Sequence, residues 1–137
     1  MEKPKILIID DDPDLVESIR ISLEANDFEV HSAHNGPAGL TLVKEFHPDL
    51  IILDVMMDSI TEGFQVSQQL RSPDPESEYR AFSNIPILML TGVSQKMHMN
   101  FSPQDDGDYL PVDEFVDKPI RLEFLLEKVR KLIRQYQ

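Results

Sequence analysis

The sequence of 137 residues contains no cysteine, which excludes disulfide bonds and thiolate zinc sites. It also lacks a long apolar run, because the run that follows "MEKPK" at the N-terminus has only four residues. A run of this length is too short for a signal peptide or a membrane span. We therefore expect a cytoplasmic protein with no inserted membrane segment.

Basic residues are scarce as well. Lysine and arginine number 13 against 25 aspartates and glutamates, which gives a net charge of −12. This excess of negative charge argues against nucleic acid and anionic membranes as direct partners. It suits cations, or basic patches on other proteins.

Short apolar runs alternate with helical patterns along the chain. The runs predict strands at 5–9, 28–33, 49–55, 85–90 and 114–117. The helical patterns predict a first helix that starts at Pro13, with Asp12 as its N-cap. They predict three further helices at 36–46, 62–71 and 120–136. The polar segment 72–84 predicts a surface loop, and 92–113 has no clean helical stripe but leaves room for a short helix at 93–100.

Strict alternation of strand and helix predicts an α/β fold, in which helices cover both faces of a five-stranded parallel sheet. The length suits one hydrophobic core, and the chain contains no internal repeat or long linker. We expect residues 1–137 to form a single domain.

Chemically active residues follow the predicted strands. Because the carboxyl ends of parallel strands meet at one edge of the sheet, we expect these residues to converge. They are Asp10, Asp11 and Asp12 after the first strand, Asp54 at the end of the third, Thr91 and Gly92 after the fourth, and Lys118 and Pro119 after the fifth. Clustered carboxylates suit a hard divalent cation such as Mg²⁺. A carboxylate beside it can attack a phosphoryl group, with a lysine and a hydroxyl to hold the transferred oxygens.

Four segments, "ILIIDDDPDL", "PDLIILDVMM", "IPILMLTG" and "FVDKPI", occur in this order and extend over nearly the whole chain. Together they resemble the signature segments of the receiver domain of two-component response regulators. The resemblance implies a flavodoxin-like (βα)₅ fold, doubly wound. It also implies that the chain accepts a phosphoryl group from a histidine kinase or phosphotransfer protein and then changes its affinity for a partner, without being a turnover enzyme.

The resemblance also implies residue roles. Asp54 is the expected phosphoacceptor, and Asp10 and Asp11 are expected to bind Mg²⁺ (or Mn²⁺), with Asp11 the more direct ligand. Met56 is expected to offer its backbone carbonyl to the metal. Thr91 and Lys118 are expected to contact the phosphoryl group, and the peptide bond between Lys118 and Pro119 is expected to be cis. Thr91 and Phe115 are expected to form a conformational switch.

The chain departs from the usual receiver pattern in three places. Asp54 is followed by "VMMDSITEG", without the usual proline, and 92–113 is several residues longer than usual. Phe115 stands where a tyrosine is common, which removes one hydroxyl from the switch. The output face of the domain is therefore expected to be atypical.

Two other classes of function remain open. One is an interaction module that keeps the receiver fold without phosphorylation. The other is a phosphatase similar to haloacid dehalogenases, suggested by Asp10-x-Asp12, although Asp14 stands where that family has threonine or valine. The four histidines lack metal-ligand spacing, "MHM" (97–99) is expected to pack on the core, and "PQDDGD" (103–108) lacks the glutamate of a calcium loop. The chain is either a whole protein or a domain of a longer one.

Overall fold

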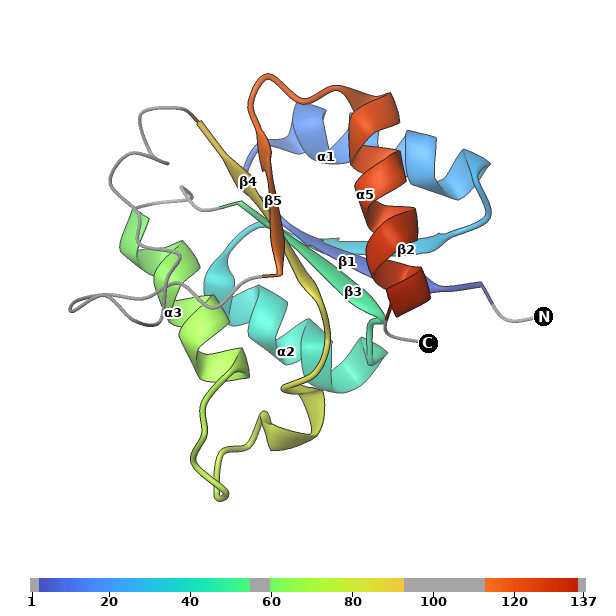
Figure 1. Cartoon of the computed structure of the whole chain (residues 1–137). Coiled ribbons are helices and arrows are strands. Elements are labelled where there is room, and N and C mark those ends of the chain that lie inside the picture. The colour runs from blue at the N-terminus through green and yellow to red at the C-terminus, as the bar shows by residue number, and fades with distance from the viewer. Residues whose placement is uncertain (1–2, 55–59, 93–112, 136–137) are drawn as a thin grey trace.

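The computed structural model describes residues 3–54, 60–92 and 113–135. A five-stranded parallel sheet with strand order β2-β1-β3-β4-β5 forms the centre of the molecule (Figure 1). Its strands are β1 (Lys5–Ile9), β2 (Glu29–Ala33), β3 (Leu50–Asp54), β4 (Ile87–Thr91) and β5 (Glu114–Asp117). The helices are α1 (Pro13–Ala25), α2 (Gly36–Phe46), α3 (Ile60–Leu70), the short 3₁₀ helix η1 (Arg80–Phe82) and α5 (Leu122–Gln135).

The predicted α/β architecture is therefore confirmed, with differences at element ends. Strand β4 begins at Ile87 instead of residue 85, since the intervening Pro86 has no N–H to donate to a neighbouring strand. The segment 72–84 is not loop throughout, because η1 lies within it. The predicted short helix at 93–100 lies outside the described residues.

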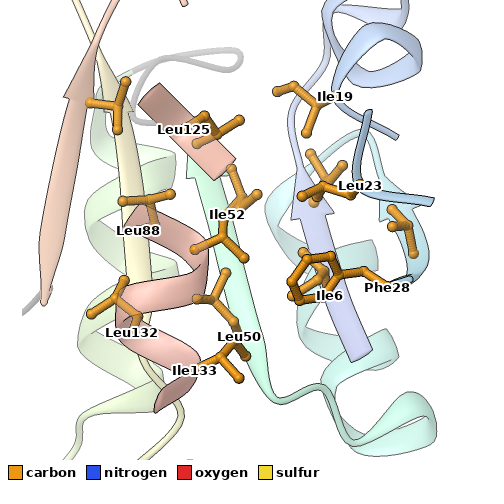
Figure 2. Close-up of a cluster of buried hydrophobic side chains, with 14 of the residues drawn as sticks. Ile6, Ile19, Leu23, Phe28, Leu50, Ile52, Leu88, Leu125, Leu132 and Ile133 are labelled. Atoms are coloured by element: carbon orange, nitrogen blue, oxygen red, sulfur yellow. The ribbon is translucent and has the colours of Figure 1, made fainter. Parts of the chain in front are cut away.

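Two hydrophobic clusters form because successive strand side chains point to opposite faces of the sheet. In β1, Ile6 and Ile8 belong to a first core cluster, whereas Leu7 and Ile9 belong to a second. The first core cluster lies between the sheet and helices α1 and α5, as Figure 2 shows. The second lies between the sheet and helices α2 and α3. A sheet buried on both faces explains why its strands are continuous apolar runs.

Local sequence explains where the helices begin. The side chain of Asp12 accepts hydrogen bonds from the N–H groups of Asp14 and Leu15, and Pro13 follows it as first helical residue of α1. The side chain of Asn35 likewise accepts from the N–H of Ala38 at 2.7 Å to cap α2. Both residues satisfy N–H groups that have no partner within their helix.

A glycine brings α2 close to β1. A Cβ atom built on Gly39 would lie 2.5 Å from Cδ1 and 2.8 Å from Cγ1 of Ile9, so a larger residue would displace the isoleucine side chain. Ile9 immediately precedes Asp10. The packing of α2 thus bears directly on the end of β1, where the predicted site begins.

Candidate functional site

The predicted site residues lie at one edge of the sheet. They stand at the carboxyl ends of β1, β3 and β4 and directly after β5. Asp10 follows β1, Asp54 ends β3 and Thr91 ends β4. All three are buried, with exposed fractions of 2%, 1% and 0%. Lys118 directly follows β5, and its N–H donates to the carbonyl of Thr91 at 2.8 Å. Four segments that are distant in sequence therefore meet at this edge.

Asp54 forms an ion pair with Lys118. The Nζ atom of the lysine donates to Oδ1 of the aspartate at 2.9 Å, from a side chain that is 32% exposed. A carboxylate buried this deeply needs a nearby positive charge to remain ionised. The pair thus joins an anion at the end of β3 to a cation that contacts solvent.

Asp10 and Asp11 complete an acidic cluster with Asp54. Each of the three offers a carboxylate oxygen, and these oxygens lie within 4.8 Å of one another. Oδ1 of Asp10 accepts from the N–H of Asp12 at 2.9 Å. Oδ2 of Asp10 is buried and has no hydrogen-bond partner among the described residues.

The environment raises the pKa of Asp10 from its usual 3.8 to about 6. Burial is the main cause, because it disfavours the charged form. The hydrogen bond from Asp12 and the charge of Lys118 lower this pKa, while the charges of Asp54 and Asp11 raise it. The positive charge near Asp10 is therefore too small to offset the effects that disfavour its ionised form.

These observations fit a divalent cation. The donors are hard carboxylate oxygens, which Mg²⁺ and Mn²⁺ prefer. A cation at this point would pair with Oδ2 of Asp10, which has no hydrogen-bond partner among the described residues, and would lower the raised pKa of this carboxyl group. Asp12 does not belong to this cluster in the described residues, since its side chain caps α1.

The remaining predicted residues have different outcomes. Thr91 lies at the edge, and its Oγ1 donates to the carbonyl of Gly92 at 3.1 Å. Phe115 is half-buried and packs against the second core cluster. The peptide bond between Lys118 and Pro119 is cis, as predicted. Met56 lies outside the described residues, so the role of its backbone carbonyl as a metal ligand stays a prediction.

One set of contacts near β5 was missed by sequence reasoning. Arg71, directly after α3, donates to Asp113, the residue before β5, and to the carbonyl of Ser83. The two charged residues are separated by 42 positions in sequence, and no pattern in either segment indicates that they meet.

Comparison with known proteins decides the family. Residues 6–130 match the response regulator receiver domain. The chain belongs to the response regulator receiver domain family. Receiver domains in two solved structures have the same fold. A response regulator of Chloroflexus aurantiacus has a TM-score of 0.77 and 26% identity, over 96% of this chain and 99% of that one. The chemotaxis response regulator CheY4 of Vibrio cholerae has a TM-score of 0.72 and 25% identity, over 95% and 98%.

Curated relatives of this receiver domain are longer. The DNA-binding dual master transcriptional regulator RpaA of Synechocystis is 36% identical over 96% of this chain and 50% of its own length. The response regulator MprA of Mycobacterium avium is 36% identical over 96% of this chain and 51% of its own. The chain spans about half the length of the curated relatives it matches. Among the residues described for the receiver domain, no helix is both long enough and apolar enough to cross a membrane.

Proposed function

We propose that this receiver domain accepts a phosphoryl group on Asp54. The observation that carries the proposal is the surroundings of this one carboxylate. It is 1% exposed, pairs with Nζ of Lys118 at 2.9 Å and lies within 4.8 Å of the Asp10 and Asp11 oxygens. A structural aspartate would need the lysine alone. The added carboxylates of Asp10 and Asp11 suit a divalent cation, which would offset their charge and draw a phosphoryl group toward Asp54.

In the proposed step, a carboxylate oxygen of Asp54 attacks phosphorus and forms an acyl phosphate. The bond from phosphorus to the donor breaks, and the donor nitrogen or oxygen leaves with the electron pair and takes up a proton. Lys118, whose Nζ lies 2.9 Å from Oδ1 of Asp54, would pair with the phosphoryl oxygens once Asp54 has lost its own charge. The chain is modified once per event, so we propose a signalling role and not enzymatic turnover.

Asp10, Asp11 and Asp54 are the residues that would hold Mg²⁺ or Mn²⁺, with the Met56 carbonyl as a further ligand. The ion would supply positive charge to the phosphoryl oxygens during transfer. Asp10 is 2% exposed, and the N–H of Asp12 fixes one of its oxygens.

Thr91 and Phe115 are the proposed switch. Thr91 lies at the end of β4, and Phe115 pairs in register with Met89 on the same strand. Movement of Thr91 toward a phosphoryl group on Asp54 would therefore shift β4 against β5, and the side chain of Phe115 would repack. Such a change shifts an equilibrium between two conformations and alters binding of a partner.

The proposed phosphodonor is a histidine kinase or phosphotransfer protein, and the proposed location is the cytoplasm. The output partner is proposed to be a protein. RpaA is described as DNA-binding, but the relatives are about twice as long as this chain, and a net charge of −12 does not favour a DNA backbone.

The test is the intact mass of the protein after incubation with acetyl phosphate and Mg²⁺. We expect one added phosphoryl group on the wild type and none on Asp54→Asn, which keeps the shape of the side chain. Asp12→Asn is the matched control and should be labelled like the wild type. In the labelled sample, NMR signals of Thr91 and Phe115 should move. Equal labelling of wild type and Asp54→Asn would refute the assignment, and no labelling of either would favour the phosphorylation-independent module.

A further inference from the structure

Strand β5 is weakly specified by hydrophobic burial. It has four residues, lies at the edge of the sheet (Figure 1), and only Val116 within it is fully buried. The register of a strand is set mainly by the side chains that it buries, so one buried residue permits slippage. Lys118 follows this strand, and its reach to Asp54 therefore depends on whatever else holds β5 in place.

Two hydrogen bonds between Asp113 and Ile87 fix the start of β5 against β4. The N–H of Asp113 donates to the carbonyl of Ile87 at 3.0 Å. In return, the N–H of Ile87 donates to Oδ2 of Asp113 at 2.8 Å. Asp113 thus forms hydrogen bonds to Ile87, the first residue of β4, through both its main chain and its side chain.

Arg71 holds the Asp113 side chain in that position. Its Nη2 donates to Oδ2 of Asp113 at 2.5 Å, and its Nη1 donates to the carbonyl of Ser83 at 2.7 Å. Both charged side chains are only 19% exposed. Hydrogen bonds between ionised groups are stronger than neutral ones, and the rigid fork of the guanidinium fixes their direction. The end of α3, the segment before β4 and the start of β5 are joined at one point.

We infer that Arg71 and Asp113 are positioning residues for Lys118. The inference rests on the proposed function, because it matters only if Lys118 takes part in phosphoryl transfer. Lys118 is five residues beyond Asp113 along the same extended segment. One residue of strand is about 3.3 Å long, so a slip by a single position exceeds the whole 2.9 Å contact between Lys118 and Asp54. The ion pair between Arg71 and Asp113 holds the start of β5 in the register that makes this contact, and the hydrogen bond from the Lys118 N–H to the Thr91 carbonyl holds its end.

The test uses two substitutions that leave the site residues intact. Asp113→Asn keeps an oxygen for the Ile87 N–H but removes the charge that Arg71 pairs with. Arg71→Met keeps the aliphatic stem and removes both hydrogen bonds. The control is Asn35→Ala, which removes the N-cap of α2, far from β5. The urea midpoints of all the variants are measured, so that the loss of stability in the control can be compared with the losses in the two variants. The double variant completes a mutant cycle.

Three measurements separate positioning from general stability. The first is the rate of phosphorylation by acetyl phosphate at saturating Mg²⁺. The second is the Mg²⁺ dissociation constant by calorimetry, which reports on Asp10, Asp11 and Asp54. The third is the NMR signal of the Lys118 side chain, assigned with Lys118→Arg, which reports directly on its pairing with Asp54.

We expect phosphorylation to slow by at least about threefold in both variants, since small displacements of a reacting group lower rates steeply. The Lys118 signal should move toward that of a solvent-exposed lysine. Mg²⁺ should bind at least as tightly as to the wild type, since no ligand is replaced and the lysine charge moves away from the Asp54 carboxylate. The double variant should be no slower than the slower single variant. If the Lys118 signal is unmoved, or the rates fall no further than in Asn35→Ala, the inference is wrong.

Failure of the proposed function gives a different result. If the wild type takes up no phosphoryl group, the Lys118 signal still reports whether Arg71 and Asp113 control its position. If the wild type is labelled and the variants are labelled equally fast, the proposed function stands and the positioning role falls.

Discussion

At the scale of single residues, the buried carboxyl group of Asp10 links stability to metal binding. Its pKa of about 6 means that the folded state binds a proton more readily than the unfolded chain does, where the pKa is near 3.8. The resulting stability is present below about pH 3.8 and is lost as the pH rises through about 6. Above pH 6 the metal-free fold therefore contains an unfavourable charge.

We predict that Asp10→Asn stabilises the metal-free protein. Asparagine retains the oxygen that accepts from the Asp12 N–H and removes the charge. At pH 8 in EDTA, the free energy of unfolding in urea should rise by about 1–3 kcal/mol, since a pKa difference of two units corresponds to this order. The gain should shrink toward zero as the pH falls below about 4. Mg²⁺ affinity should fall in the same variant.

Asp12→Asn is the control for this prediction. It removes the same charge at an exposed position and keeps a side chain that caps helices well, so its stability should change by less than about 0.5 kcal/mol. A stability gain in Asp12→Asn equal to that in Asp10→Asn would show that net charge, and not burial of Asp10, is responsible.

Sequence reasoning placed most of the individual site residues. Asp10, Asp54, Thr91 and Lys118 were expected at one edge because parallel strands end there, and the structure has them there. Burial, the unpartnered oxygen of Asp10 and its pKa depend on atoms from several elements. No local pattern records them, and their roles in phosphoryl transfer remain proposals.

At the scale of elements, the packing of α2 on β1 depends on Gly39. We predict that Gly39→Ala destabilises the protein by about 1 kcal/mol, because overpacking against Ile9 outweighs the better helix propensity of alanine. The free energy of unfolding should be measured in a cycle with Ile9→Val, which removes the Cδ1 atom that lies 2.5 Å from the added Cβ.

The double variant Ile9→Val/Gly39→Ala should lose less stability than the sum of the two single variants, since the shortened side chain makes room. Additive losses would mean that the helix and strand separate instead of repacking, and would contradict the close contact.

Element positions were predictable to within a few residues, and the exceptions have physical causes. The strands were marked by apolar runs because both sheet faces are covered. The η1 helix was missed because three residues are too few for a periodic pattern, and Tyr79 and Phe82, which pack on the second core cluster, are embedded in polar sequence. The strand order was not predicted, because it depends on contacts between distant segments that no local pattern records.

At the scale of the whole molecule, the net charge of −12 couples folding to cations. We predict that Mg²⁺ stabilises the fold through the acidic cluster. A specific ligand adds about 1.4 kcal/mol at ten times its dissociation constant and about 2.7 kcal/mol at a hundred times. Thermal unfolding with increasing MgCl₂ should show this dependence, and Asp11→Asn should weaken it.

NaCl at matched ionic strength is the control, because salt also relieves general repulsion in an acidic protein. If NaCl raises the unfolding temperature as much as MgCl₂ does, the effect belongs to the overall charge and the acidic cluster holds no specific ion.

The contact between Lys118 and Asp54 spans 64 positions of the chain, and this separation has a consequence for biosynthesis. Translation produces Asp10, Asp11 and Asp54 well before Lys118. A nascent chain that pairs β1 with β3 gathers three carboxylates with the lysine still missing, and their repulsion opposes that pairing. The finished chain carries its own counter-charge for the acidic edge, and the unfinished chain does not.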